Sequence, residues 1–99
     1  MTIQKTKEGS ALTIALEGRL DTVTAPQLEG ELRSATDGVT KLIFDLSALD
    51  YISSAGLRVL LSAQKVMNRQ GSMSIRNVSE EIMEIFEVTG FTDILSIEQ

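Results

Sequence analysis

Residues 42–61, LIFDLSALDYISSAGLRVLL, join a short apolar run, an acidic segment, two adjacent serines and the start of a leucine-rich stretch. Residues 42–44 and Leu46 form a nearly continuous apolar run, which is typical of a central strand covered on at least one face. Apolar residues between 57 and 67 predict a helix, and Gly71 is expected to end it. The sequence thus predicts a strand, a loop that holds the serines, and a helix.

The segments before this stretch predict two strands and one helix. Residues 3–7 favour a short strand, and residues 12–16 alternate apolar and polar side chains as a half-buried strand does. Apolar residues at helical spacing predict an amphipathic helix over residues 25–35. Thr24 and Gln27 have the spacing of a capping box at its start.

The segments after it predict a further strand over residues 73–76 and a last helix. Ser79 is the expected N-cap of that helix, and Gly90 is the expected C-cap. Residues 94, 95 and 97 are expected to complete the core. Helices that alternate with strands predict an α/β fold in which strands joined through a helix run parallel. Ninety-nine residues suit one domain, residues 1–99.

The composition excludes several classes of function. The chain has no cysteine and no histidine, which removes disulfides, thiolate metal sites and the commonest general base. Its formal net charge of −5 argues against nucleic acid as a partner. The sequence contains neither a membrane-spanning apolar run nor a signal-peptide core, so we expect a cytoplasmic protein without membrane insertion. A monomer is the default expectation.

Two aspartates follow or end strands and could carry chemistry. Asp21 and Asp45 could together bind a hard cation such as Mg²⁺, but solvated turn carboxylates are the simpler interpretation, and we predict no metal site. No glycine-rich phosphate loop is present, and a serine nucleophile would lack a histidine base. The sequence therefore predicts a protein that is not an enzyme and needs no cofactor.

The paired serines have two interpretations. Either Ser53 or Ser54 could be the N-cap of the following helix. Alternatively, Ser54 could receive a phosphate from another protein, because free N–H groups and the helix dipole favour an anion there. A phosphate carries a charge of about −1.5 to −2, which would change the surface that a partner meets.

The stretch 42–61 resembles the signature of the STAS-domain anti-sigma factor antagonists, in which a strand with Asp-x-Ser leads to a phosphorylatable serine and Gly-Leu. EGRLDTVTAPQLEGEL, residues 17–32, is similar to that family's Gly-x-Leu-Asp strand exit and first helix. FEVTGFTDIL, residues 86–95, also looks like the family. The resemblance covers nearly the whole chain.

The resemblance implies a small domain with a mixed sheet of four to five strands and helices mainly on one side. It implies partner switching: the unmodified form binds an anti-sigma factor that is also a serine kinase, and a sigma factor is released. Phosphorylation by that kinase breaks the complex, and a PP2C-type phosphatase restores the unmodified form. The alternative is a constitutive STAS scaffold, or a small soluble subunit of a transport or signalling assembly, in which the serine is only a cap.

Carried over by position, the phosphorylated serine is Ser54, with Ser53 as the less favoured acceptor. The remaining residues that the resemblance assigns to the surroundings of the phosphosite and to partner binding are Asp21, Thr22, Asp45, Ser47, Ser53, Ala55, Gly56, Arg58 and Ser62. Two positions depart from the common pattern of the family. Ser53 stands where Asp is common, and Ala55 stands where Ser or Thr is common.

Overall fold

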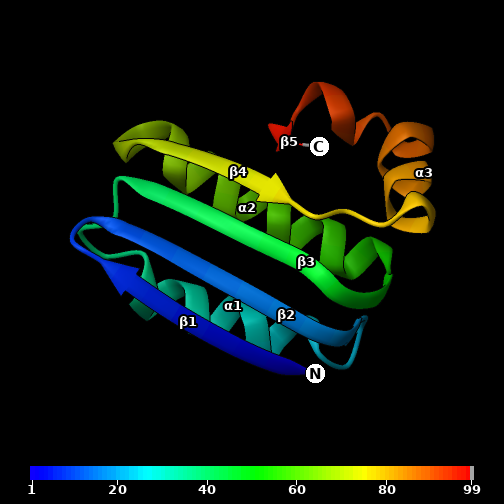
Figure 1. Ribbon diagram of the computed structural model, residues 1–99, viewed down its shortest axis with the longest axis horizontal. Helices are drawn as coiled ribbons and strands as arrows, with labels where there is room; N and C mark the ends of the chain where they lie inside the picture. Colours follow the sequence, from blue (N-terminus) through cyan, green and yellow to red (C-terminus); the bar gives the residue numbers. More distant parts are fainter. Residues whose placement is uncertain (99) are drawn as a thin grey trace.

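A computed structural model describes residues 1–98 (Figure 1). Its elements in chain order are β1 (Thr2–Glu8), β2 (Ala11–Leu20), α1 (Ala25–Ala35), β3 (Lys41–Ile52), α2 (Ser54–Gln70), β4 (Ser72–Arg76), α3 (Glu80–Thr89), the short 3-10 helix η1 (Phe91–Asp93) and β5 (Ile97–Glu98). They confirm the predicted α/β class and the helix over residues 25–35.

The five strands form one mixed sheet in the order β1-β2-β3-β4-β5. The β1–β2 pair is antiparallel, and the three other pairs are parallel. The parallel pairs follow from the helices that intervene in the chain. The family resemblance had implied four to five strands, and the fifth, the short strand β5, pairs with β4 through Ile75 and Arg76.

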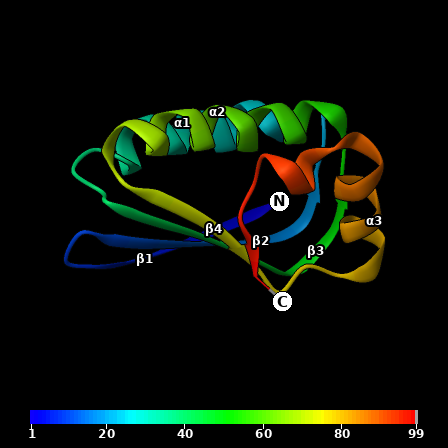
Figure 2. The same cartoon turned by 90° about the horizontal axis from the view of Figure 1, so that it is seen from above.

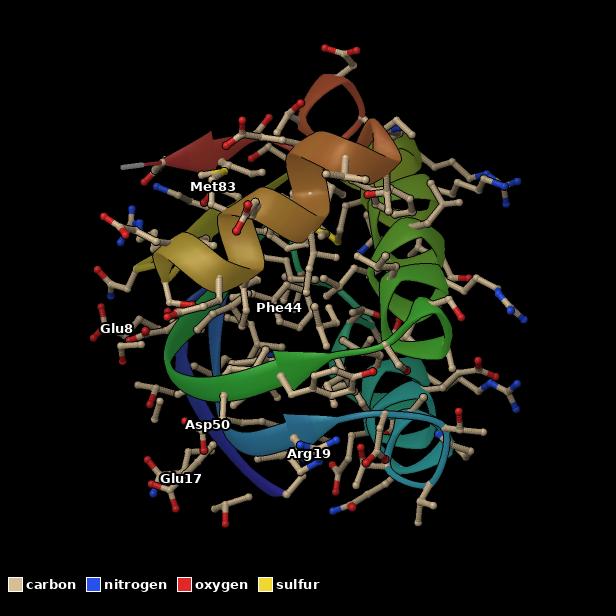
Figure 3. The ribbon with its side chains drawn as sticks, turned by 90° about the vertical axis from the view of Figure 1, so that its right-hand side faces the viewer. Glu8, Glu17, Arg19, Phe44, Asp50 and Met83 are labelled. Atoms are coloured by element: carbon tan, nitrogen blue, oxygen red, sulfur yellow. The ribbon has the colours of Figure 1, made fainter. Side chains whose placement is uncertain are left out.

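Helices α1 and α2 cover one face of the sheet, while α3 lies at the end of the sheet where β3 turns into α2 (Figure 2). The core lies between the sheet and these helices and is made of apolar side chains from every layer, among them Ile14, Leu28, Phe44, Leu60 and Phe86. Figure 3 shows Phe44 in this interior. Within residues 1–98 no helix covers the other face of the sheet, so the confirmed arrangement is helices mainly on one side.

Strand β3 is longer than the sequence predicted. The expected loop after Leu46 is wrong, because β3 continues to Ile52. Its pairing with β2 shifts twice, and each time β3 carries one extra residue, the pattern of a β-bulge. The β3 side chains of the core cluster are therefore two residues apart up to Leu46 and three apart after it, at Leu49 and Ile52. Because of this change of period, the sequence pattern did not indicate that β3 continues beyond Leu46.

The bulges also shape the molecule. A bulged strand bends and twists more strongly than a regular one. In Figure 2, β2 and β3 curve at their carboxyl ends towards the helix layer. Strand β3 therefore ends next to the start of α2, and Ser53 is the only residue between Ile52 and that helix.

The ends of the helices agree only partly with the sequence. Ser79 caps α3 by accepting a hydrogen bond from the main-chain N–H of Ile82 at 3.3 Å, and Gly90 ends that helix with φ 80°, as predicted. The capping box at α1 is wrong, since the Thr24 side chain makes no cap hydrogen bond to the helix. Ile94 is also not a core residue, because 48% of its surface is exposed.

None of the helices within residues 1–98 has the length and apolar character needed to cross a membrane.

Candidate functional site

The site is built where β2 and β3 end side by side. Leu20 and Ile52 are paired in the parallel ladder, and the main-chain N–H of Ser53 donates to the Leu20 carbonyl oxygen at 2.9 Å. The turn that follows β2 therefore lies against the start of α2. This contact brings Asp21 and Thr22, the first residues of the turn, next to the serine pair.

Asp21 organises the turn rather than facing solvent freely. Its Oδ1 accepts hydrogen bonds from the main-chain N–H groups of Val23 at 3.0 Å and Thr24 at 3.1 Å. These bonds, led by the one from Thr24, hold the pKa of the Asp21 carboxyl below its ordinary value of 3.8. Thr24 in turn donates from Oγ1 to the carbonyl of Arg19 at 2.8 Å. Asp21 thus holds the turn that leads into α1, while the N–H of Gln27, which a capping box would bind, donates to the main-chain carbonyl of Thr24 at 3.0 Å.

The two serines have different roles. The Ser53 hydroxyl accepts a hydrogen bond from the main-chain N–H of Gly56 at 3.4 Å, so Ser53 is the N-cap of α2. Ser54 is the first helical residue and its side chain is exposed. Within residues 1–98 its hydroxyl makes no side-chain hydrogen bond. The sequence had left the cap open between the two, and the structure assigns it to Ser53.

Gly56 permits the close approach of α2 to the strand ends. A Cβ atom at this position would lie 2.7 Å from Cγ of Leu20 and 2.9 Å from Cγ1 of Ile52. Real side chains do not approach that closely. A residue without a side chain is therefore required for α2 to begin where it does.

Several predicted partner-binding residues lie together. Thr22, Ala55, Arg58 and Ser62 line one hollow between the start of α1 and the first turns of α2. Arg58 and Ser62 are exposed on α2, four residues apart, so they share one face of the helix. The structure thus gathers the predicted residues of the β2 turn and of α2 around the start of α2.

Asp45 and Ser47 do not join this group. Asp45 lies in the first half of β3, opposite Ala15 of β2, which is on the order of 15 Å along the strand before Leu20 at roughly 3.3 Å per residue. The Asp45 carboxylate accepts hydrogen bonds from the main-chain N–H of Ser47 at 3.0 Å and from Nδ2 of Asn77 at 3.1 Å. Both bonds hold its pKa below 3.8, the Ser47 bond most strongly. This pair connects β3 to the loop after β4.

Asp21 and Asp45 lie too far apart along the sheet to bind one metal ion together. Each carboxylate already accepts hydrogen bonds from its own surroundings. Over residues 1–98 no three His, Cys, Asp or Glu side chains gather in a group that could hold a metal ion.

Sequence reasoning missed one pair beside the site. The Arg19 guanidinium lies over the ring of Tyr51, 4.2 Å from its centroid, and Arg19 Nε is 3.6 Å from Oδ2 of Asp21. Arg19 and Tyr51 are partners across β2 and β3, and Tyr51 is 38% exposed. Figure 3 shows Arg19 at this end of the molecule. The sequence offered one signal for this pair, its position: Arg19 lies two residues before Asp21, and Tyr51 lies two residues before Ser53.

These features define a small α/β domain with an exposed serine at a strand-to-helix junction. The sequence model of the STAS domain family matches residues 2–99, and the chain belongs to that family.

Curated relatives extend over most of the chain. A Bordetella bronchiseptica protein, BtrV, named as a candidate anti-sigma factor antagonist, is 37% identical over 98% of this chain and 85% of its own. The anti-sigma-B factor antagonist of Bacillus subtilis is 30% identical over 87% of this chain and 80% of its own.

Solved structures share the fold at lower identity. An anti-sigma factor antagonist from Mycobacterium paratuberculosis aligns with a TM-score of 0.87 and 22% identity, over 97% of this chain and 83% of its own. The anti-sigma factor antagonist SpoIIAA in its unphosphorylated form aligns with a TM-score of 0.78 and 19% identity, over 99% of this chain and 88% of its own. A sulfate transporter family protein from Wolinella succinogenes aligns with a TM-score of 0.78 and 18% identity, over 93% of this chain and 76% of its own.

Proposed function

We propose that the chain is an anti-sigma factor antagonist that works by partner switching in the cytoplasm. The unphosphorylated form binds an anti-sigma factor that is also a serine kinase, and the sigma factor is released. The kinase then phosphorylates Ser54, which breaks the complex. A PP2C-type phosphatase removes the phosphate and restores binding.

The observation that carries this proposal is the division of roles between the two serines. Because Ser53 caps α2, the Ser54 hydroxyl is free and exposed at the start of that helix. A phosphate on Ser54 would keep the cap, and its charge of about −1.5 to −2 would lie at the end of the helix where the dipole favours anions. The surface would change while the fold stayed intact, which is what a reversible binding switch requires.

The relatives support the same function. BtrV and the Bacillus subtilis protein carry the name of anti-sigma factor antagonist and align over most of this chain. SpoIIAA has been solved in a phosphorylated form as well, and this chain aligns with it over 99% of its length at a TM-score of 0.76.

The test is incubation with the cognate anti-sigma factor kinase and ATP, followed by mass-spectrometric mapping of the modified residue. We expect one phosphate on Ser54, its loss in Ser54→Ala, and its retention in Ser53→Ala. In calorimetry, Ser54→Asp should bind the kinase at least tenfold more weakly than Ser54→Ala. Phosphate transfer that survives Ser54→Ala would contradict the proposal.

The second candidate is a constitutive STAS scaffold or a small subunit of a transport or signalling assembly. The resemblance to the transporter family protein from Wolinella succinogenes favours it. In that case Ser54 would be an exposed helix residue with no role in binding. A complex whose affinity is the same for Ser54→Asp and the unmodified chain would support this candidate.

A further inference from the structure

Helix α2 carries an unbalanced positive charge. Its residues include Arg58, Lys65 and Arg69 but no Asp or Glu, in a chain whose formal net charge is −5. All three side chains are exposed, and within residues 1–98 none of them forms an ion pair. Together with Ser62 they are spaced along one face of the helix, and we call this row of four residues the α2 stripe.

A furrow between α1 and α2 runs beside the α2 stripe. Two adjoining hollows form it and share Glu29, Val59 and Ser62 in their walls. One hollow opens at Arg58, near the start of α2, and the other reaches Val66, which is 41% exposed. The hollow at Val66 has a volume of about 260 Å³. The furrow is therefore large enough for an apolar side chain of another protein.

The two rims of this furrow differ in charge. On the α1 side Glu29 is paired with Arg33 at 2.8 Å, so that rim is neutral. On the α2 side Arg58 has no carboxylate partner among the described residues, and that rim is positive. Among the described residues, a partner that lies over the furrow therefore meets an unpaired cation on the α2 side only.

We propose that the α2 stripe and the α1–α2 furrow bind an acidic segment of the partner protein. Carboxylates of that segment pair with Arg58, Lys65 and Arg69, while an apolar side chain enters the furrow at Val66. The inference rests on the proposed function, because the furrow begins beside Ser54, and it adds the chemistry of the partner. Complementary charge of this kind sets orientation and the rate of association.

Helix α3 gives the opposite charge to another side of the molecule. It carries four glutamates and no Lys or Arg, at positions 80, 81, 84 and 87. An acidic partner is repelled by α3 and attracted by α2, so the chain's own charge distribution favours one orientation. A polyanionic membrane is the less suitable occupant, since the chain as a whole is negative and the stripe contains no large apolar side chain.

The same surface explains how a phosphate could release the partner. Ser54 lies four residues before Arg58, and side chains at this spacing are neighbours on a helix. A phosphate on Ser54 can therefore form an ion pair with the Arg58 guanidinium, which would otherwise pair with a carboxylate of the partner. The modified chain loses one cation from the α2 stripe and gains an anion at its end.

The test compares two double variants that change the charge equally. Lys65→Glu/Arg69→Glu reverses the far half of the α2 stripe, and Lys7→Glu/Lys41→Glu reverses two exposed lysines on β1 and β3. Binding to the cognate anti-sigma factor kinase is measured by stopped-flow association over a range of salt concentrations. We expect the stripe variant to associate at least tenfold more slowly, with a weaker salt dependence, and the control to change less than twofold.

A third variant tests the furrow. Val66→Ala should leave the association rate unchanged and speed dissociation several-fold, because it removes contact area without changing charge. Equal effects of the two charge variants would overturn the inference. So would loss of binding to phosphatidylglycerol vesicles in the stripe variant while its complex with the kinase stays intact.

Ser54→Asp in the same assay separates this inference from the proposed function. If the stripe variant weakens the complex and Ser54→Asp does not, the docking surface stands and the phosphorylation switch fails. If Ser54→Asp weakens it and the stripe variant matches the control, the switch stands and the docking surface fails. If the unmodified chain forms no complex with the kinase, both fall.

Discussion

The carbonyl oxygen of Leu20 accepts a hydrogen bond from the main-chain N–H of Ser53 at 2.9 Å, and this bond ties the exit of β2 to the start of α2. The same residue packs on the helix, since a Cβ on Gly56 would lie 2.7 Å from its Cγ and 3.0 Å from its carbonyl oxygen. The Asp21 turn and the serine pair therefore form one unit. A change at any of these contacts should alter the whole site.

Gly56→Ala should destabilise the protein by about 1–3 kcal/mol, because the added methyl group has no room against Leu20 and Ile52. Gly30→Ala is the matched control, since the space around Gly30 within α1 is open. There the change should stabilise by about 0.4–1 kcal/mol. Urea denaturation gives both values, and equal effects at the two glycines would contradict the close packing of α2.

The two serines should respond differently to alanine. Ser53→Ala removes the N-cap and should cost about 0.5–1 kcal/mol, the lower part of the usual range, because the cap bond is long at 3.4 Å. Ser54→Ala removes an exposed hydroxyl and should change the free energy of unfolding by less than about 0.5 kcal/mol. Thermal or urea denaturation of both variants decides. A larger loss at Ser54 would mean that the cap has been assigned to the wrong serine.

Stability should fall in acid through Asp21 and Asp45. Hydrogen bonds to both carboxylates lower their pKa in the folded state below 3.8, so the unfolded chain binds protons first as the pH falls. The stabilisation is complete above about pH 5 and is lost as the pH falls through 3.8 towards the folded-state pKa. Asp21→Asn and Asp45→Asn keep one acceptor oxygen without titrating. Each should flatten the dependence of the urea midpoint on pH between 5 and 2.5.

The combined Asp21→Asn/Asp45→Asn variant should reduce the pH dependence of the urea midpoint by the sum of the two single effects, since the effects of distant sites on stability add. An unchanged acid dependence in the double variant would show that neither carboxylate is stabilised by folding.

A phosphate on Ser54 should titrate at a lower pH than an isolated phosphoserine. Arg58 lies one helical turn away and favours the dianion, so the second pKa should fall below its usual value of about 6. Phosphoserine incorporated at position 54 during synthesis allows ³¹P NMR titration without any kinase. Arg58→Gln should raise the pKa again, while Lys65→Gln should not. The same pKa in all three chains would exclude the contact.

The regular elements of the fold were open to prediction because their signals are local. The spacing of Leu28 and Leu32 gave α1, and Ser79 and Gly90 marked the ends of α3. The alternation in β2 is regular up to Leu16, before its pairing with β3 shifts. Such signals depend on residues that are close together in the chain.

The second half of β3 was not predictable in this way. Its bulges are defined by pairing with β2, and β2 is distant in the sequence. The same is true of Asp45, whose partner Asn77 comes from another loop, and of Arg19 over Tyr51. Asp21 and the serine pair follow the paired strand ends Leu20 and Ile52, and a common position of such segments at the carboxyl ends of strands is what an α/β sheet leads one to expect.

The two extra residues in β3 fix the number of residues between Leu46 and Ser54. A deletion of Ser47 or Ala48 would restore the regular two-residue spacing and keep Leu49 on the core face, but it would remove a bulge and the bend that the bulge gives to β3. The carboxyl end of β3 would then no longer curve towards the helix layer, and the serine pair would lose its place beside Leu20. Loops at Gly9 and Gly38 can change in length when new variants are built, but the segment from Leu42 to Gly56 must be kept at its present length.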